Sequence, residues 1–231
     1  MRSWRIVNEV GRASDIHANP TFFLDQRTAR FVEVTRSALV LGSSQDVRAV
    51  DRDALEALGA ELVIRKSGGG AVYLLPHGQI WVDISVPRSD PLFSDDVGRS
   101  FLAIGEMFLK VLSNLGCNDL EMHSGRLTGG ELSRTLCFAG LGPGEIAFEG
   151  AKILGMSQRR TAMGAVFQCT LYLSYPFDQL HRVMSQAGFE FPRRGYALGI
   201  AEILNEFADL APVEAMTHLK NRLEEALETL A

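Results

Sequence analysis

The sequence predicts an α+β fold in which mixed, largely antiparallel sheets are packed with helices. Two observations favour this class. Short apolar segments and longer amphipathic segments both occur along the chain, but they do not follow the regular strand–helix–strand order of a doubly wound parallel sheet. Several of the apolar segments are separated by short turns, which is typical of antiparallel strands paired as hairpins.

Helices and strands can be assigned in order from sequence period and end signals. Strict alternation over residues 79–86 predicts a half-buried antiparallel strand. Residues 94–96, Ser-Asp-Asp, are good helix caps, and an apolar stripe then predicts a helix to about residue 115, ended by Gly116. The other predicted helices cover residues 21–32, 51–58, 178–187, 197–208 and 213–230. The other predicted strands cover residues 38–41, 61–65, 71–75 and 165–174, together with a hairpin of 146–149 and 152–157.

Residues 117–144 show no clear period and are predicted to form a loop. No linker or internal repeat divides the chain, so residues 1–231 are predicted to form one domain. The C-terminal helices, over 178–231, are expected to pack on this domain or to form a small appendix.

Composition and charge exclude several classes of protein. The chain has 231 residues, of which 46% are hydrophobic and 22% charged, so it is neither disordered nor collagen-like. The net charge of -5 argues against broad binding to nucleic acid or to a membrane surface. No apolar run is long enough to cross a membrane or to act as a signal peptide. The 3 cysteines contain no CxxC pair, so we expect a cytoplasmic protein with reduced thiols and no metal site.

A glycine-rich loop between two predicted strands is the first feature with possible chemistry. Its three consecutive glycines allow backbone amides to approach a ligand closely, and the cations before them attract phosphate or carboxylate. The residue order differs from that of a Walker loop and of a dinucleotide-binding loop. A simple turn or bulge is the alternative interpretation. The loop reads Arg65, Lys66, Ser67, Gly68, Gly69, Gly70, Ala71 and Val72.

A second feature is Lys152, at the start of an otherwise apolar strand. This strand continues through Gly155, Ser157 and Gln158 to Arg159 and Arg160. A lysine in this position could simply extend its ammonium to water along an exposed edge.

Together, residues 67–72 and 152–160 resemble the lipoate-protein ligase and octanoyltransferase branch of the biotin and lipoate protein ligase family. The resemblance is strongest over residues 20–175, with weaker matches at Leu24-Asp25 and at Leu41-Gly42-x-x-Gln45. It implies that family's catalytic-domain fold and an enzyme that attaches a lipoyl or octanoyl group to one lysine of a lipoyl-carrier domain. The implied carriers are the glycine cleavage H protein and the E2 subunit of 2-oxoacid dehydrogenases.

The resemblance also implies roles for the matched residues. Lys152 would stabilise the negative charge that builds on the acyl carbonyl oxygen. The three glycines would wrap the acyl chain or its activating phosphate, which Arg65 and Lys66 would neutralise. The implied substrate-binding residues are Arg65, Lys66, Ser67, Gly68, Gly69, Gly70, Ala71, Gly155, Ser157 and Gln158.

Two chemistries are known on this scaffold. A ligase uses ATP, magnesium and lipoate to form an acyl-adenylate, whereas a transferase moves octanoate from acyl carrier protein through an enzyme cysteine. Cys137 lies fifteen residues before Lys152, and its Cys-Phe sequence and spacing resemble the cysteine-dependent octanoyltransferases. Gly70 resembles the ligases instead, because those transferases usually have arginine there.

Two other positions depart from the ligases, which commonly have His-Asp after the glycine loop and Asn-Asp where Gly144-Glu145 stands here. Despite these departures, Gly70 slightly favours the ligase, and a transferase with Cys137 as nucleophile is the alternative. A non-catalytic lipoate- or acyl-binding protein is a third possibility.

Other chemically interesting side chains are assigned structural or peripheral roles. Cys117 and Cys169 are expected to be packing residues. No histidines have metal-ligand spacing, and Asp83 is equally consistent with a pocket wall and with a solvated strand face. A small acidic lipoyl domain would be attracted by a basic rim formed by Arg159, Arg160, Arg193 and Arg194.

Overall fold

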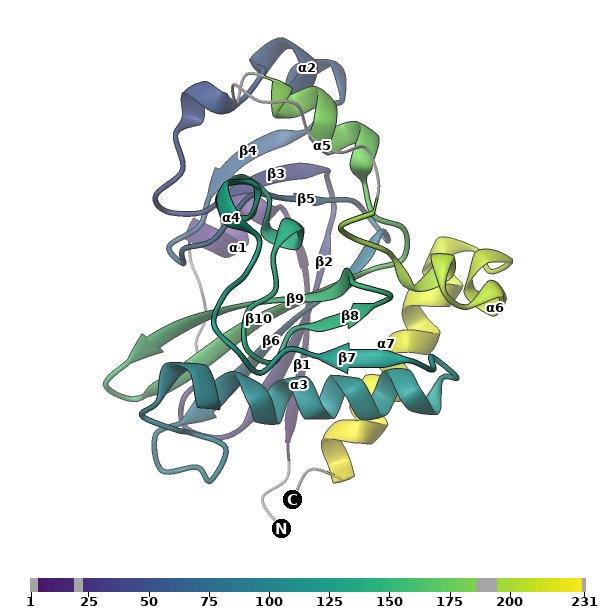
Figure 1. The fold of residues 1–231 in the computed structure, drawn as a ribbon. Helices are drawn as coiled ribbons and strands as arrows, with labels where there is room; N and C mark the ends of the chain where they lie inside the picture. Colours follow the sequence, from purple (N-terminus) through teal and green to yellow (C-terminus); the bar gives the residue numbers. More distant parts are fainter. Residues whose placement is uncertain (1–3, 19–22, 186–194, 230–231) are drawn as a thin grey trace.

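A seven-stranded sheet forms the centre of the computed structural model, which describes residues 4–18, 23–185 and 195–229 (Figure 1). The strand order is β1-β2-β6-β10-β9-β8-β7. β1 pairs in parallel with β2, and the other neighbouring strands of this sheet are antiparallel. The strands are β1 (Arg5–Gly11), β2 (Thr28–Val34), β6 (Gln79–Pro87), β7 (Leu120–Met122), β8 (Ile146–Phe148), β9 (Ala151–Thr161) and β10 (Gly164–Tyr172).

A smaller, three-stranded sheet lies against one face of the large one (Figure 1). It consists of β3 (Ala38–Leu41), β4 (Glu61–Ile64) and β5 (Val72–Leu74), in the order β4-β3-β5. Helix α1 (Ala13–Ala18) packs between the sheets, since Ile16 shares a buried cluster with Val40 and Trp81. Helices α2 (Arg52–Ala57) and α5 (Phe177–Val183) cover the outer side, where Leu55 and Leu180 belong to one apolar cluster.

The other face of the large sheet is covered by α3 (Val97–Asn114) and α7 (Pro212–Thr229) (Figure 1). Phe108 of α3 and Leu219 and Leu223 of α7 are buried in the same core as the sheet. The C-terminal helix therefore contributes to the main hydrophobic core. No helix among the described residues is both long and apolar enough to cross a membrane.

The central strand β6 differs from its prediction, because all nine of its residues are buried rather than half-buried. Its apolar face packs on the α3 and α7 core, and its other face is covered by the small sheet and α1. Asp83 on that second face is 1% exposed and pairs with the buried Arg30 of β2. An ion pair thus compensates the burial of polar groups between the two sheets.

The architecture confirms the predicted α+β class with largely antiparallel sheets. The predicted hairpin is present as β8 and β9, and its turn places Glu149 and Gly150 at φ values of 49° and 80°. Helix α3 begins where expected, since the Asp96 carboxylate accepts a hydrogen bond from the Arg99 amide.

Three further sequence predictions are wrong. The helix predicted over residues 21–32 is strand β2 from Thr28 onward, where pairing with β1 and β6 outweighs the helix-start signal; residues 19–22 lie outside the described ranges. The helix predicted over 197–208 is only a 3₁₀ turn, Ile200–Glu202, followed by α6 (Asn205–Ala208). The loop predicted over 117–144 contains β7, α4 (Gly130–Thr135) and a 3₁₀ turn, Cys137–Ala139.

Helix α3 approaches the turn before β8 so closely that a side chain at Gly105 has no room. A Cβ atom at Gly105 would lie 2.2 Å from the Gly144 carbonyl oxygen. We expect Gly105→Ala to lower the free energy of unfolding by about 1–3 kcal/mol, because the helix or the turn must shift. Urea denaturation measures this change.

Gly98→Ala on the same helix is the matched control. A Cβ there would meet only ordinary contacts, at 3.5 and 3.8 Å, so this substitution should be neutral or stabilise by up to about 1 kcal/mol. Equal stability of the two variants would show that the close approach of α3 to Gly144 is not rigid.

Candidate active site

Strand β9 holds Lys152 by its backbone on both sides. Lys152 pairs with Ala147 of β8 in the sheet register. On its other side, the Lys152 amide donates to the Tyr196 carbonyl at 3.0 Å, and the Leu198 amide donates to the Lys152 carbonyl at 3.0 Å. The side chain is 2% exposed. Lys152 is therefore an internal residue and does not extend to water along an exposed edge.

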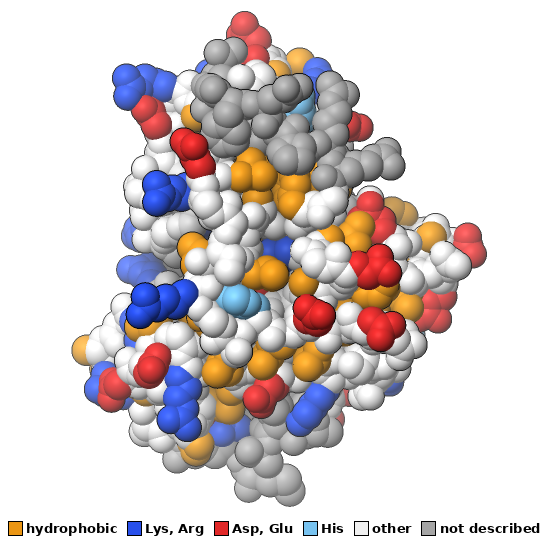
Figure 2. All heavy atoms as spheres, viewed as in Figure 1, with side chains coloured by type: hydrophobic (Ala, Val, Ile, Leu, Met, Phe, Trp, Pro, Cys, Tyr) orange, Lys and Arg blue, Asp and Glu red, His pale blue; other side chains and the backbone are white. Residues whose placement is uncertain are grey.

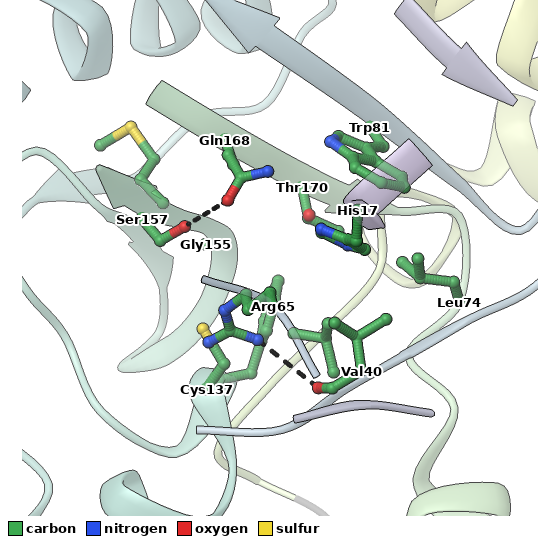
Figure 3. A pocket seen from close by; sticks show the side chains of 13 residues that line it. His17, Val40, Arg65, Leu74, Trp81, Cys137, Gly155, Ser157, Gln168 and Thr170 are labelled. Carbon is green, nitrogen blue, oxygen red and sulfur yellow. Dashed lines mark hydrogen bonds between the residues drawn. The ribbon is translucent and has the colours of Figure 1, made fainter. Parts of the chain in front are cut away.

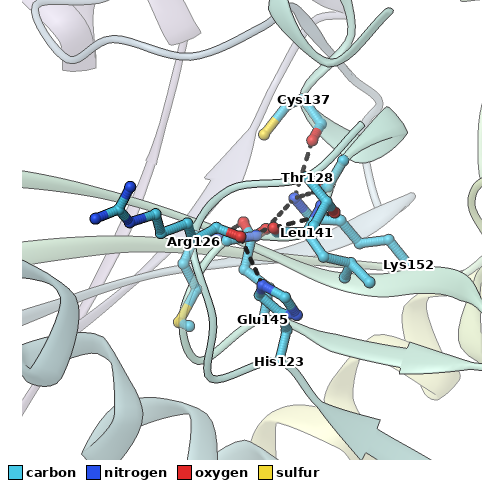
Figure 4. Close-up of polar contacts among 10 residues, drawn as sticks. His123, Arg126, Thr128, Cys137, Leu141, Glu145 and Lys152 are labelled. Carbon is cyan, nitrogen blue, oxygen red and sulfur yellow. Dashed lines mark hydrogen bonds and ion pairs between the residues drawn. The ribbon is translucent and has the colours of Figure 1, made fainter. Parts of the chain in front are cut away.

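The Lys152 ammonium is fully hydrogen-bonded by residues 137–145 (Figure 4). Nζ donates to the carbonyl oxygens of Cys137 and Gly140, at 2.9 and 3.0 Å, and to Oε2 of Glu145 at 2.6 Å. Nζ also lies 5.2 Å from the centre of the Phe138 ring. Because an ammonium has three hydrogens, its donors are all used, and the turn that carries Cys137 is tied to β9.

Glu145 is the counter-ion of Lys152 and was not among the residues assigned from sequence. It is 4% exposed, and its Oε2 also accepts the Gly142 amide at 2.6 Å. Its Oε1 accepts the Met156 amide at 2.8 Å. One carboxylate thus joins the turn, the lysine and strand β9. The available sequence signal was an acidic residue directly before the apolar strand β8, in the place of the Asn-Asp pair of ligases.

The glycine loop lies between β4 and β5, and the Arg65 side chain stabilises it through hydrogen bonds. The buried guanidinium donates to the carbonyl oxygens of Gly68 and Gly70, at 2.9 and 2.8 Å. Burial lowers the pKa of Arg65, and the neighbouring Cys137 and Tyr172 oppose this shift. Lys66, by contrast, is exposed. Arg65 is therefore a structural cation of the loop that also faces the site.

The glycine loop and the Cys137 turn are in direct backbone contact. The Ala71 amide donates to the Thr135 carbonyl oxygen at 2.7 Å, and the Cys137 amide donates to the Ala71 carbonyl oxygen at 3.1 Å. A Cβ at Gly70 would lie 2.5 Å from the Cys137 nitrogen. Glycine at position 70 is therefore required by the packing of the Cys137 turn against the loop.

The other predicted substrate-binding residues occupy the wall between loop and strand. Ser67 donates to Oε1 of Gln168 at 3.0 Å, and Ser157 donates to the same oxygen at 3.4 Å. Gln158 donates to Ser100 of α3 at 2.8 Å. Gly155 allows the Phe138 ring to pack on β9, since a Cβ there would lie 2.7 Å from a ring carbon.

Two neighbouring cavities, which share four lining residues, lie beside this wall. A wide cleft of about 400 Å³ is lined by residues of the glycine loop, by Cys137, Glu145 and Lys152, and by Arg160. A narrow slot of about 40 Å³ lies deeper, between the two sheets, and its walls include Val40, Val72, Leu74, Trp81 and Phe138 (Figure 3). The residues that line both cavities are Arg65, Cys137, Met156 and Ser157. Cys137 therefore lies at the junction of cleft and slot.

His17 and Trp81 form one end of the slot (Figure 3). Their rings stack with centroids 4.9 Å apart and planes 21° apart. Trp81 Nε1 donates to Asp83 at 2.8 Å, so the buried Arg30–Asp83 pair fixes this wall from behind. Burial, Arg65 and Arg30 lower the pKa of His17 to about 4, which makes its imidazole neutral at pH 7.

A buried lysine, a glycine loop and an apolar slot between two sheets are the features that a comparison with known families has to explain. Residues 16–223 match the family described as lipoyl protein ligase A/B catalytic domain, and the chain belongs to this family. The predicted family and fold are thereby confirmed. No curated protein matches the chain in sequence.

Solved structures of related proteins share the fold. A lipoate-protein ligase A crystallised with ATP has a TM-score of 0.70 and 19% identity, over 98% of this chain and 86% of that one. The Thermoplasma acidophilum protein Ta0514 with bound lipoic acid has a TM-score of 0.69 and 19% identity, with the same coverage. A bipartite lipoate protein ligase from Thermoplasma acidophilum, studied with its E2 lipoyl domain, has a TM-score of 0.66 and 17% identity, over 98% of this chain and 84% of that one.

The structure brings most of the sequence-assigned residues together. The wide cleft is lined by Arg65, Gly68, Gly69, Gly70, Cys137, Lys152, Ser157 and Gln158. Ser67 and Ala71 are buried behind it, and Gly155 lines the slot. Within residues 4–18, 23–185 and 195–229, no three His, Cys, Asp or Glu side chains form a possible metal site. Sequence reasoning missed Glu145, His17 and Trp81.

Removal of the Glu145 charge should strongly destabilise the protein. Glu145→Gln leaves the Lys152 ammonium buried without its counter-ion, and we expect the free energy of unfolding to fall by about 3–5 kcal/mol. Urea denaturation measures this loss. Glu149→Gln is the matched control, because Glu149 is exposed and its change should stay within about 0.5 kcal/mol. A loss in Glu145→Gln no larger than in the control would contradict the structural role of the pair.

The neutral His17 should make the free energy of unfolding decrease at acidic pH. The pKa of His17 is 6.5 in its ordinary state and about 4 in the fold. Between these values the unfolded chain binds a proton that the folded chain does not, so stability falls as the pH falls from 6.5 to 4. We expect this loss to be about 3 kcal/mol smaller in His17→Phe. Denaturation of both proteins at pH 7 and pH 4 measures it, and identical pH dependence would argue against a buried, neutral His17.

Proposed function

We propose that this protein transfers a medium-chain acyl group, lipoyl or octanoyl, to a lysine of a lipoyl-carrier domain through a thioester on Cys137. The observation that carries this proposal is the place of Cys137, at the junction of the apolar slot and the open cleft. An acyl chain that enters the slot has its carbonyl group at this junction. The carrier's lysine reaches the same carbonyl from the cleft.

Gly70 no longer separates the two chemistries. Its sequence match to the ligases favoured an ATP-dependent reaction, but its Cβ position is blocked by the Cys137 backbone. Glycine at position 70 is explained by packing and is therefore no argument for a ligase. The Cys-Phe match to the transferases, in contrast, concerns Cys137, which lines both cavities.

The proposed reaction has two acyl-transfer steps. The Cys137 thiolate attacks the carbonyl carbon of an acyl thioester donor such as acyl carrier protein, a new carbon–sulfur bond forms, and the donor's thiolate leaves. The neutral amine of the carrier's lysine then attacks the Cys137 thioester. A carbon–nitrogen bond forms, the bond to Cys137 breaks, and the nitrogen's proton passes to the released thiolate or to solvent.

Two buried cations support this chemistry. Arg65 lines both cavities beside Cys137 and attracts the negative charge that the sulfur carries as a nucleophile. Lys152 fixes the Cys137 carbonyl and lines the cleft in which the carbonyl oxygen gains charge. Because both groups are already hydrogen-bonded in place, little reorganisation is needed when charge develops.

An ATP-dependent ligase is the second candidate. The cleft of about 400 Å³ is also lined by Gly68, Gly69 and Arg160, so it has room and a cation for an activating group. Arg160 is held in place above the Phe93 ring, 4.6 Å from its centre. In this reaction Cys137 would only line the site.

The carrier is expected to approach the cleft across the basic rim. Arg160 lines the cleft, and Arg159 precedes it on β9, whereas Arg193 and Arg194 lie outside the described residues. Figure 2 shows basic side chains along the edge of this face and acidic ones gathered over α6. An acidic lipoyl domain would therefore meet favourable charge on the side of β9.

Cys137→Ala should abolish ATP-independent transfer. Wild-type protein mixed with octanoyl-acyl carrier protein and an apo lipoyl domain should acylate that domain, and Cys137→Ala should slow the reaction by at least about a thousandfold. Without the lipoyl domain, the wild-type enzyme itself should gain the mass of one acyl group. Mass spectrometry of both proteins measures these changes.

Cys117→Ala is the control for loss of a thiol. Cys117 is buried, and burial raises the pKa of its thiol to about 11, so it should not carry the acyl group. Modification that requires lipoate, ATP and magnesium, and is undiminished in Cys137→Ala, would identify the ligase instead. Tight acyl binding without modification in either mixture would identify a non-catalytic acyl-binding protein.

A further inference from the structure

Strand β1 forms one edge of the seven-stranded sheet and, in the described part of the chain, pairs only with β2. Such an edge presents a row of backbone groups with which another strand can pair. Natural sheets usually protect an edge with charged side chains, proline, a bulge or a short strand. The opposite edge strand, β7, follows this rule, because it has only three residues and exposes Glu121.

β1 has none of these protections. Its seven residues, Arg5–Gly11, pair with Thr28–Val34 in one unbroken register, and the strand contains no proline or lysine. Its exposed side chains are Ile6, Asn8 and Val10, none of which is charged. The two apolar ones, at positions 6 and 10, are 38% and 65% exposed. The free edge is therefore open to regular pairing with a further strand.

The backbone groups of the same three residues point away from β2. At one end of the pairing, the Arg5 amide donates to the Arg27 carbonyl oxygen at 3.0 Å. At the other end, the Thr35 amide donates to the Gly11 carbonyl oxygen at 2.9 Å. Successive residues of a strand turn their N–H and C=O groups to opposite edges, so the odd-numbered residues of β1 bond to β2. The N–H and C=O groups of the even-numbered residues therefore lie at the free edge.

These groups match a second copy of β1 that runs antiparallel, with Asn8 opposite Asn8 of the other copy. In this register Ile6 lies opposite Val10 of the other copy, and Val10 lies opposite its Ile6. All three become hydrogen-bonded pairs of an antiparallel ladder, so the outward N–H and C=O groups of both edges are satisfied. The exposed apolar side chains of the two copies also meet as cross-strand neighbours, which stabilises a sheet.

The charges of β1 favour the same arrangement. Arg5 and Glu9 lie toward opposite ends of the strand, so an antiparallel copy brings its Glu9 diagonally next to Arg5, whereas a parallel copy would bring like charges together. Directly opposite, Arg5 faces Gly11. Glu9 faces Val7, so no like charges oppose each other. The two Glu9 side chains also come diagonally near each other, but each is balanced by its own Arg30, at 3.0 Å.

We propose that two copies of this protein associate through β1 as a two-fold symmetric dimer, in which the two large sheets join into one continuous sheet. A contact built on a single strand is small, so dimer and monomer should exchange at concentrations of about 10–100 µM. The inference is independent of the proposed acyl transfer, because β1 lines neither the cleft nor the slot.

Sedimentation equilibrium of the full-length protein tests the inference. Asn8→Pro removes the N–H at the centre of the contact and costs no hydrogen bond to β2, because the Asn8 amide points outward. We expect it to weaken the dimer at least about tenfold. Asn8→Thr is the matched control, because threonine keeps the amide and favours strands, so the dimer affinity should change less than about threefold.

A pair of charge substitutions tests the register itself. Ile6→Glu and Val10→Lys each place a charge against an apolar side chain of the other copy, so each alone should weaken the dimer at least about tenfold. In the double variant, the introduced carboxylate at position 6 faces the introduced ammonium at position 10 of the other copy. We expect the double variant to dimerise at least about fivefold more tightly than either single variant.

Three results would overturn the inference. The first is a wild-type protein that stays monomeric up to about 500 µM. The second is a dimer that Asn8→Pro leaves unchanged, which would place the contact elsewhere. The third is a double variant no tighter than the single ones, which would exclude the proposed register. Because Ile6 and Val10 are exposed, the charge variants test the inference even if Asn8→Pro does not fold.

Discussion

The buried ion pair between Lys152 and Glu145 is the interaction on which the geometry of the site depends. A charged lysine beneath the protein surface needs an acceptor for each hydrogen, and residues 137–145 supply them all. The pair thereby fixes the carbonyl of Cys137, and Glu145 extends the connection to β9 through the Met156 amide. Because α3 packs against Gly144 of the same segment, the position of the thiol depends on the large sheet and its covering helix together.

Three buried cations lie in or behind the walls of the two cavities, and they differ in their partners. Lys152 is balanced by Glu145, and Arg30 is balanced by Asp83. Arg65 is hydrogen-bonded only to backbone carbonyl oxygens among the described residues. Its positive charge is therefore not cancelled by a neighbouring carboxylate. That uncompensated charge lies where the slot meets the cleft, which is also where a thiolate or a developing oxyanion would need stabilisation.

The fold class could be predicted from sequence because it follows from local signals, and the residues of the cleft could be assigned because two short motifs together resemble one family. The glycine run, the lysine at the start of an apolar strand and the capped helix α3 are each visible in a few neighbouring residues. β2 was predicted as a helix because its strand conformation depends on pairing with β1 and β6. β6 lies far from it in the chain, and no sequence pattern predicted β1. The complete burial of β6 likewise depends on a second sheet that no local pattern reveals.

The parts of the site that the sequence did not reveal are those made by long-range contact. His17 comes from a six-residue helix and joins Trp81 only when α1 packs between the two sheets. The motif residues, in turn, are explained by packing and hydrogen bonding. Gly70 and Gly155 make room for Cys137 and Phe138, and Ser67 and Ser157 both donate hydrogen bonds to the Gln168 side chain. The motif residues therefore shape the cleft and the place of Cys137, whereas His17 and Trp81 in the wall of the slot lie outside the motif. A sequence motif of this kind reveals the cleft better than it reveals the apolar slot beside it.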